Sequence, residues 1–267
     1  MFPGAAADRE SADYALVGAP LDRSTSSRPG ARFGPRRIRH RAGGFEDFDH
    51  RTGAKFTDRS VYDHGDVGPT ADAAEYLDFL TGTLSDLREE GATPLLVGGE
   101  HTVTVAGVRA VDPDVYVCLD AHLDLRESYA GDPLSHATVT RHALAVADRA
   151  VLLGARAGSE AEWERAAEAD VTVVPPEDAA EWSPDLDGES AYLSVDVDAF
   201  DPGFAPGTGT PEPFGLASRE GRRLVSRVAP ACEGFDVVEV NDRDDGQAAT
   251  LAAKLLRRFV HDHAAEG

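Results

Sequence analysis

The 267-residue chain is long enough for one large α/β domain, and with 42% hydrophobic residues it can bury a sizeable core. It carries 48 acidic and 26 basic residues, a net charge of −22, and its only lysines are Lys55 and Lys254. This charge excludes partners that need a basic face, namely nucleic acid and anionic membrane surfaces. No basic leader precedes an apolar segment and no apolar run reaches the length of a membrane span, so we expect a cytoplasmic protein.

The acidic residues are spread along the whole chain, which argues against a single cationic partner. We expect a halophilic protein, because abundant counter-ions in a salt-rich cytoplasm screen the repulsion of an acidic surface. An ordinary acidic protein is the alternative, and no gain of stability between dilute and molar KCl would favour it. Cys118 and Cys232 are too few for a disulfide framework, and both lie beside strand-like segments, where we expect buried thiols.

Strand-like and helix-like segments alternate along the chain. Leucines three and four apart over 77–87 predict a helix that stops at Gly91, a similar stripe over 251–259 predicts another, and Pro35 is placed to begin a third. This alternation predicts a three-layer α/β/α fold with a mostly parallel sheet of about eight strands, formed by residues 1–267 as a single domain. The β-rich runs are 14–18, 61–62, 94–99, 115–119, 150–154, 171–174, 191–195 and 235–240, and the stretches expected to be irregular are 22–34, 43–60, 123–136 and 199–217.

Polar side chains follow three of the predicted strands. In an extended chain, residues two apart face the same side, so an Asp-x-His-x-Asp or Asp-x-Asp pattern directs its side chains to one place. Ligands bind beyond the carboxyl ends of such strands. The candidates are His101 after the run 94–99, Asp120, His122 and Asp124 after 115–119, and Asp196 and Asp198 after 191–195.

These carboxylates and imidazoles would repel or desolvate one another without cations between them. The donor set suits manganese, iron or zinc, and four carboxylates are enough to bridge two ions, which can hold a hydroxide nucleophile between them. Each pattern alone also occurs in turns and in phosphate-transferring enzymes, whereas the three together favour a two-metal site. Asp201, beside Pro202, is expected to form a turn rather than to bind metal.

Longer segments carry a resemblance to a known family. The segments "GGEHTVT", "DAHLDLRESYAGDPLSHAT", "SVDVDAFDPGFAPGTGTPEP" and "DVVEVN" are similar to four signature segments of the ureohydrolases, the family of arginases and agmatinases, and "GAPLDRSTSSRPGARFGPRRIR" resembles its N-terminal segment. The resemblance implies an arginase-like fold, two Mn²⁺ ions, and hydrolysis of a guanidino group to urea and an amine. It also implies a homo-oligomer, a trimer or hexamer.

The resemblance further implies a role for individual residues. Glu239 matches the carboxylate that pairs with the substrate guanidinium, with a structural salt bridge as the alternative. His136 matches the histidine that relays a proton to the leaving amine, and Asp124 is also implied in holding the tetrahedral intermediate. The implied ligands of one manganese are His101, Asp120, Asp124 and Asp196, and those of the other are Asp120, His122, Asp196 and Asp198. Glu100 stands in place of the more usual Asp but is not expected to be a ligand.

The segment between Asp124 and His136 is acidic and looks like that of an agmatinase, so we expect agmatine to be hydrolysed to putrescine and urea, a step of polyamine biosynthesis. Glu127 and Asp132 would favour a second amine in the substrate, although general surface acidity also explains them. Alternative substrates are aminopropylagmatine, guanidinobutyrate, arginine and formiminoglutamate. More distant alternatives are a mononuclear deacetylase relative, an inactive metal-binding protein, and a phosphotransferase with Asp196 as nucleophile.

Overall fold

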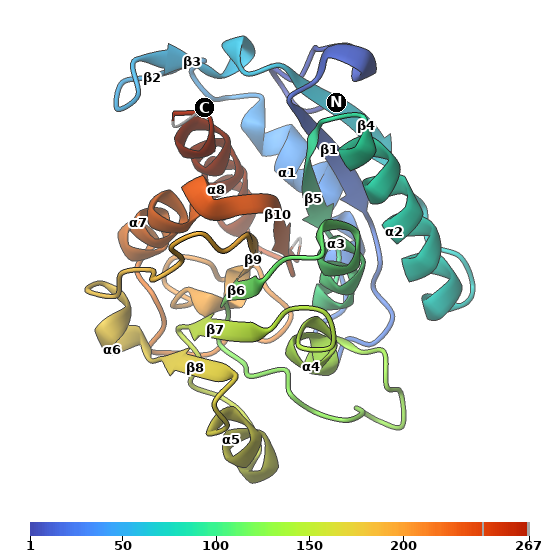
Figure 1. The fold of residues 1–267 in the computed structure, drawn as a ribbon, viewed down its shortest axis with the longest axis vertical. Helices are drawn as coiled ribbons and strands as arrows, with labels where there is room; N and C mark the ends of the chain where they lie inside the picture. Colours follow the sequence, from blue (N-terminus) through green and yellow to red (C-terminus); the bar gives the residue numbers. More distant parts are fainter. Residues whose placement is uncertain (242, 266–267) are drawn as a thin grey trace.

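Eight strands form one parallel sheet in the computed structural model, which describes residues 1–241 and 243–265 (Figure 1). The strand order is β4-β1-β5-β10-β9-β6-β7-β8, and every neighbouring pair runs parallel. This confirms the predicted fold class. The strands are β1 (Tyr14–Ala19), β4 (Val61–Asp66), β5 (Thr93–Gly98), β6 (Val115–Leu119), β7 (Arg149–Leu153), β8 (Val171–Val174), β9 (Ala191–Asp196) and β10 (Cys232–Val238).

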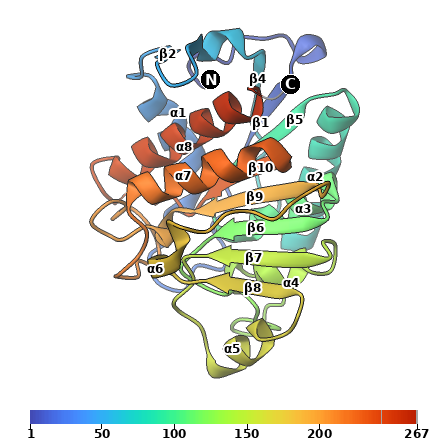
Figure 2. The ribbon, with the colours of Figure 1, turned by 60° about the vertical axis from the view of Figure 1, so that its left-hand side comes forward.

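Helices cover both faces of the sheet and make the outer two layers (Figure 2). Residues of α1, α7 and α8 share one hydrophobic cluster with the sheet, and residues of α2, α3 and α4 share the other. None of the helices within the described residues is long and apolar enough to cross a membrane. The helices are α1 (Gly34–Ala42), α2 (Ala73–Glu89), α3 (Thr104–Val111), α4 (Val139–Ala143), α5 (Glu160–Ala166), α6 (Pro176–Ala179), α7 (Ser218–Val228) and α8 (Gln247–His263).

The helix α2 shows how the sequence fixes an element locally. Asp72 caps its N-terminus, where the side chain accepts a hydrogen bond of 3.0 Å from the backbone N–H of Glu75. The leucine stripe over 77–87 is buried against the sheet, as its spacing predicts. The helix ends at Glu89, just before Gly91, which has a positive φ of 97° that disfavours other residues.

The stretch 43–60, expected to be irregular, contains a small antiparallel hairpin, β2 (Phe48–Asp49) with β3 (Ala54–Lys55). The predicted run 61–62 also extends further, to Asp66. The sequence does not mark this extension as a strand, because β4 is an edge strand with one partner. Most of its residues are only half-buried, so polar side chains are tolerated there.

The four central strands β5, β10, β9 and β6 end at the same edge of the sheet. Gly99, directly after β5, allows the loop after β1 to approach that edge, because a Cβ atom at Gly99 would lie only 1.9 Å from the carbonyl oxygen of Leu21. The backbone N–H of Glu100 donates a 2.8 Å hydrogen bond to the same carbonyl. The sheet edge and this loop therefore form one surface.

Candidate metal centre and active site

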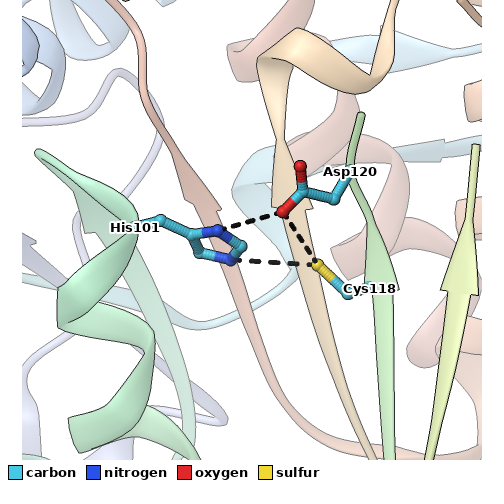
Figure 3. A group of neighbouring side chains, drawn as sticks. All are labelled: His101, Cys118 and Asp120. Carbon is cyan, nitrogen blue, oxygen red and sulfur yellow. Dashed lines mark hydrogen bonds and ion pairs between the residues drawn. The ribbon is translucent and has the colours of Figure 1, made fainter. Parts of the chain in front are cut away.

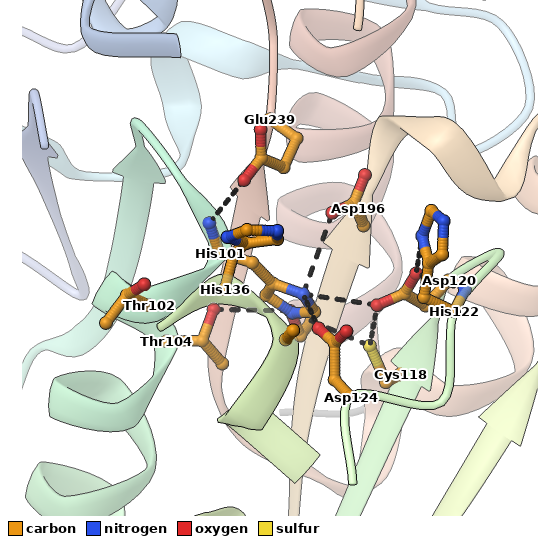
Figure 4. Close-up of polar contacts among 12 residues, drawn as sticks. His101, Thr102, Thr104, Cys118, Asp120, His122, Asp124, His136, Asp196 and Glu239 are labelled. Carbon is orange, nitrogen blue, oxygen red and sulfur yellow. Dashed lines mark hydrogen bonds and ion pairs between the residues drawn. The ribbon is translucent and has the colours of Figure 1, made fainter. Parts of the chain in front are cut away.

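The predicted metal ligands meet at the carboxyl ends of the central strands (Figure 4). His101 follows β5 and begins a short 3₁₀ turn, Asp120 follows β6, and Asp196 is the last residue of β9. All six predicted ligands except His122 are buried, and His122 is partly exposed. Segments separated by up to 97 positions in the sequence thus converge because their strands are neighbours in the sheet.

The imidazole of His101 faces three carboxylates. Its Nδ1 lies 3.0 Å from Asp124 Oδ2, 3.1 Å from Asp120 Oδ2 and 3.6 Å from Asp196 Oδ2. Asp124 reaches this position with a left-handed backbone, at a φ of 51°, which is uncommon for residues other than glycine. Three carboxylates therefore lie within 3.6 Å of one nitrogen of His101.

The imidazole of His122 faces a second set of carboxylates. Its Nδ1 lies 3.1 Å from Asp198 Oδ2 and 3.6 Å from Asp120 Oδ1. The ligand atoms of Asp120, His122 and Asp198 all lie within 4.8 Å of one another. Because Asp120 contacts both histidines, one through each oxygen, the two sets are adjacent and share a carboxylate.

Cys118 also lies beside this cluster, with its Sγ 3.8 Å from His101 Nε2 and 3.9 Å from Asp120 Oδ2 (Figure 3). It contacts the nitrogen of His101 that points away from the carboxylates. Complete burial raises the pKa of the thiol to about 11, which keeps it protonated. Because Cys118 faces the nitrogen of His101 that points away from the carboxylates, it is interpreted as a packing residue, as the sequence indicated.

Two carboxylates of the cluster, Asp196 and Asp124, have a destabilised charge, whereas hydrogen bonds from His101 and His122 outweigh burial and lower the pKa of Asp120. Burial, followed by the charges of Asp198 and Asp120, raises the pKa of Asp196 well above its ordinary value. Burial and Asp120 raise the pKa of Asp124 to about 7. Within residues 1–241 and 243–265, no lysine or arginine forms an ion pair with the acidic groups predicted as ligands, so divalent cations fit the chemistry of this donor set.

Glu239 lies at the end of β10, between β5 and β9 in the sheet order. Its Oε1 accepts a 2.8 Å hydrogen bond from the backbone N–H of His101, and its backbone is left-handed, with a φ of 59°. Burial raises the pKa of this carboxyl to about 8. Its carboxylate makes no ion pair within the described residues, so the salt-bridge alternative is wrong there.

A cavity of about 310 Å³ opens beside the cluster. His122, Asp124 and His136 contribute to its wall, and Figure 4 places His136 on the same side of the cluster as Glu239. Burial, and secondarily the nearby histidines, lower the pKa of His136. The residues that line the cavity are Ser26, His122, Asp124, Arg126, Tyr129, His136, Ala137, Ala157, Gly158, Glu162 and Thr210.

Neither Glu127 nor Asp132 lies on the cavity wall. The side chain of Glu127 is 85% exposed and pairs with Arg141 at 3.2 Å, and Asp132 accepts a 2.9 Å hydrogen bond from the backbone N–H of Leu134. Surface acidity is therefore the better interpretation of both residues. Arg126 lies on the wall instead, and its Nε is 3.2 Å from the buried Glu162 carboxylate.

Several polar residues around the cluster were not singled out from the sequence. Thr210 donates a 2.9 Å hydrogen bond to Asp198 Oδ2. Ser194 lies 3.2 Å from His101 Nε2 and donates a 2.6 Å hydrogen bond to the buried Asp236. The alternation rule could have found Ser194, two residues before Asp196 in β9, whereas no local pattern marks Thr210. Asp201 forms the expected turn, accepting a 2.9 Å hydrogen bond from the Gly203 N–H.

Comparison with known proteins agrees with this architecture. The sequence profile described as the arginase family matches residues 12–261. The chain is 37% identical to N(1)-aminopropylagmatine ureohydrolase of Thermococcus kodakarensis, over 92% of this chain and 89% of that protein, and 35% identical to the agmatinase of Bacillus subtilis, over 94% and 92%. The crystal structure of agmatine ureohydrolase of Thermoplasma volcanium superimposes with a TM-score of 0.93 at 33% identity, covering 99% of this chain and 94% of that one.

The parallel sheet and its edge of carboxylates and imidazoles define a metal-dependent hydrolase of the α/β class. The chain belongs to the arginase family. It is a ureohydrolase, an enzyme that releases urea from a guanidino substrate, and it carries the residues of the binuclear metal site of this family.

Proposed function

We propose that the protein hydrolyses agmatine to putrescine and urea with two manganese ions. The observation that carries the proposal is the cluster of buried carboxylates around two imidazoles, in which no lysine or arginine forms an ion pair with a proposed ligand within the described residues. The similarity to agmatinases and to agmatine ureohydrolase supports the choice of substrate. When bound, the two ions would acidify the attacking water and offset the negative charge of the transition state.

The two sets of contacts correspond to the two proposed metal positions. Asp120 bridges the sets by direct contact with both histidines. Asp196 is the second proposed bridge, because it lies 3.6 Å from His101 on one side and accepts the backbone N–H of Asp198 on the other. The proposed ligands are His101, Asp120, Asp124 and Asp196 for one ion, and Asp120, His122, Asp196 and Asp198 for the other.

Glu239 is proposed to hold the substrate guanidinium. A planar guanidinium presents parallel N–H donors, which one carboxylate accepts in a bidentate manner. The backbone N–H of His101 holds Oε1 of Glu239, and the left-handed backbone fixes the direction of the side chain. A carboxylate held at the cluster in this way would orient the guanidinium carbon towards the attacking water.

Asp124 and His136 complete the proposed reaction. Asp124 lies on the cavity wall beside the cluster, where its carboxylate would hold the attacking water or the tetrahedral intermediate. His136, on the same wall, would protonate the leaving amine, because an imidazole exchanges protons near neutral pH. Loss of the amine as a neutral or protonated group then leaves urea.

N(1)-aminopropylagmatine is the second candidate substrate, favoured by the 37% identity to the Thermococcus kodakarensis enzyme. It shares the guanidino end of agmatine and differs only at the distal end. The wall of the cavity carries Arg126, whose charge is balanced by Glu162, and the ring of Tyr129. This composition is compatible with either distal group.

A urea-release assay with added manganese tests the proposal. The panel contains agmatine, aminopropylagmatine, guanidinobutyrate, arginine and formiminoglutamate, each compared by kcat/KM at low and high KCl. We expect the highest value for agmatine and no turnover by the metal-chelated protein. A clear preference for arginine contradicts the proposed substrate, and metal counting that finds one ion per chain contradicts the binuclear centre.

A further inference from the structure

Glu100 is buried beside the proposed metal ligand His101, yet it faces the loop after β1 instead of the cluster. Its side chain is 1% exposed and accepts four hydrogen bonds. Two come from the backbone N–H groups of Arg23 and Ser24, the latter at 2.7 Å. The others come from the hydroxyls of Ser24, at 2.9 Å, and Thr102, at 2.7 Å. Because four donors converge on it, Glu100 acts here as an acceptor only.

Ser24 connects this carboxylate to His136. Its Oγ lies 3.0 Å from His136 Nδ1 and also accepts a 3.0 Å hydrogen bond from the backbone N–H of His136. Ser24 and His136 are 112 positions apart, so the connection exists only in the folded chain. The ring of Tyr129 packs edge-on against His136, with the centroids 5.4 Å apart, and fixes the imidazole from another side.

The hydrogen bonds of the Ser24 hydroxyl indicate which ring nitrogen of neutral His136 carries the proton. A serine hydroxyl has one O–H and two lone pairs. The O–H of Ser24 points to Glu100, which can only accept, so Oγ must accept both contacts from His136. The hydroxyl of Ser135 lies 3.4 Å from the same Nδ1. This distance fits a bifurcated hydrogen bond, in which the Nδ1–H group donates mainly to Ser24 and more weakly to Ser135. Neutral His136 then carries its proton on Nδ1.

We propose that Glu100, acting through Ser24, is a positioning residue that holds neutral His136 in the Nδ1–H tautomer and leaves Nε2 free for the reaction. The inference rests on the role proposed above for His136. In one turnover, Nε2 takes the proton released by the attacking water and returns it to the leaving nitrogen. The proton count is balanced, and the Nδ1–H tautomer is restored.

The first test reads the tautomer and does not depend on turnover. The ¹⁵N chemical shifts of the histidine rings are recorded at about pH 8, with diamagnetic Zn²⁺ in place of manganese, and His136 is assigned by comparison with His136→Asn. We expect the Nδ1–H form in the parent protein. In Glu100→Gln, the amide NH₂ can donate to Ser24 and free its hydroxyl to donate to Nδ1, so we expect the Nε2–H form.

The second test measures turnover in Ser24→Ala. We expect kcat to fall about tenfold with little change in KM, less than the roughly hundredfold loss expected when the imidazole itself is removed. Ser24→Thr, which keeps the hydroxyl, should restore most of kcat. The matched control is Ser27→Ala in the same loop, where the exposed side chain has no hydrogen bond within the described residues. Circular dichroism and melting curves confirm that each variant is folded.

Three results would overturn the inference: an Nε2–H tautomer in the parent protein, an unchanged tautomer in Glu100→Gln, or unchanged kcat in Ser24→Ala. Failure of the proposed function is distinguishable from all three. It would be the absence of urea release by the parent protein with every substrate of the panel, a result that leaves the tautomer measurement intact.

Discussion

Two buried aspartates, Asp63 in β4 and Asp196 in β9, are in opposite electrostatic situations. Arg39 donates two parallel hydrogen bonds, of 2.8 Å and 2.9 Å, to the carboxylate of Asp63. Burial alone would raise the pKa of Asp63, but the interaction with Arg39 outweighs burial and lowers this pKa below its usual value. Burial, followed by the charges of Asp198 and Asp120, raises the pKa of Asp196, although His101 lies 3.6 Å away and acts in the opposite direction. The chain itself provides the cation that pairs with Asp63, whereas Asp196 is proposed to receive its cations as metal ions.

The largest expected effect comes from Asp196→Asn. This change removes a charge that divalent metal needs, so we expect urea release to fall to the background of the assay. In chelator, the variant should melt at or above the temperature of the parent protein, because a repelled buried carboxylate has been removed. Added Mn²⁺ should stabilise the parent protein and not the variant. If Mn²⁺ stabilised Asp196→Asn as much as the parent protein, Asp196 would not need a metal ion, and the contrast drawn between Asp196 and Asp63 would be wrong.

The converse change is Asp63→Asn, which leaves the buried Arg39 with only part of its partner set. We expect a loss of about 3 kcal/mol in the free energy of unfolding and no loss of kcat/KM. Urea denaturation and the urea-release assay measure the two quantities. Glu127→Gln is the control, because it breaks an exposed pair with Arg141 and should cost less than about 1 kcal/mol. If kcat of Asp63→Asn fell as far as that of Asp196→Asn, the Asp63–Arg39 pair would not be purely structural, which would contradict the interpretation.

His136→Asn separates loss of proton transfer from loss of metal binding, because it leaves all proposed metal ligands in place. We expect kcat to fall about hundredfold, with metal binding retained, because the change removes a proton-transfer group only. Calorimetric titration with Mn²⁺ separates this outcome from loss of the centre. Metal binding that is lost together with activity would place His136 among the residues that build the centre.

The smallest expected effect concerns acid unfolding. The pKa of Asp63 is lower in the folded state than in the unfolded chain, so its stabilising contribution is complete above about pH 4 and is lost as the pH falls through the folded value. Urea unfolding between about pH 3 and pH 6 should therefore show a shallower decline in Asp63→Asn than in the parent protein. Identical pH dependence would contradict the assignment of this pKa.

Features with a local signature were predictable from the sequence. The eight strands follow from β-rich runs and the stop of α2 follows from Gly91, whereas the alternation expected in "SVDVD" ends at Asp196, because Asp198 lies in a 3₁₀ turn over Val197–Ala199. The convergence of His101, Asp120 and Asp196 then followed from the parallel arrangement of their strands. These predictions needed no knowledge of distances.

Features that depend on contacts between loops were not predictable. Glu100 is not expected to be a ligand, and only the fold shows that it accepts a hydrogen bond from Ser24, which lies 3.0 Å from His136. Glu127 and Asp132 lie near Asp124 in the sequence, but neither lines the cavity. Proximity along a loop therefore says little about which side chain reaches a substrate. The halophilic character and the trimeric or hexameric assembly remain predictions.

The place of β10 in the sheet has a consequence for the order of events during synthesis. Residues 232–238 are the last strand to leave the ribosome, yet they lie between β5 and β9, which carry His101 and Asp196. The arrangement of His101 and Asp196 on either side of β10 is complete only after that strand inserts. A nascent chain stalled before β10 should therefore not retain both of the proposed manganese ions, whereas the completed chain should.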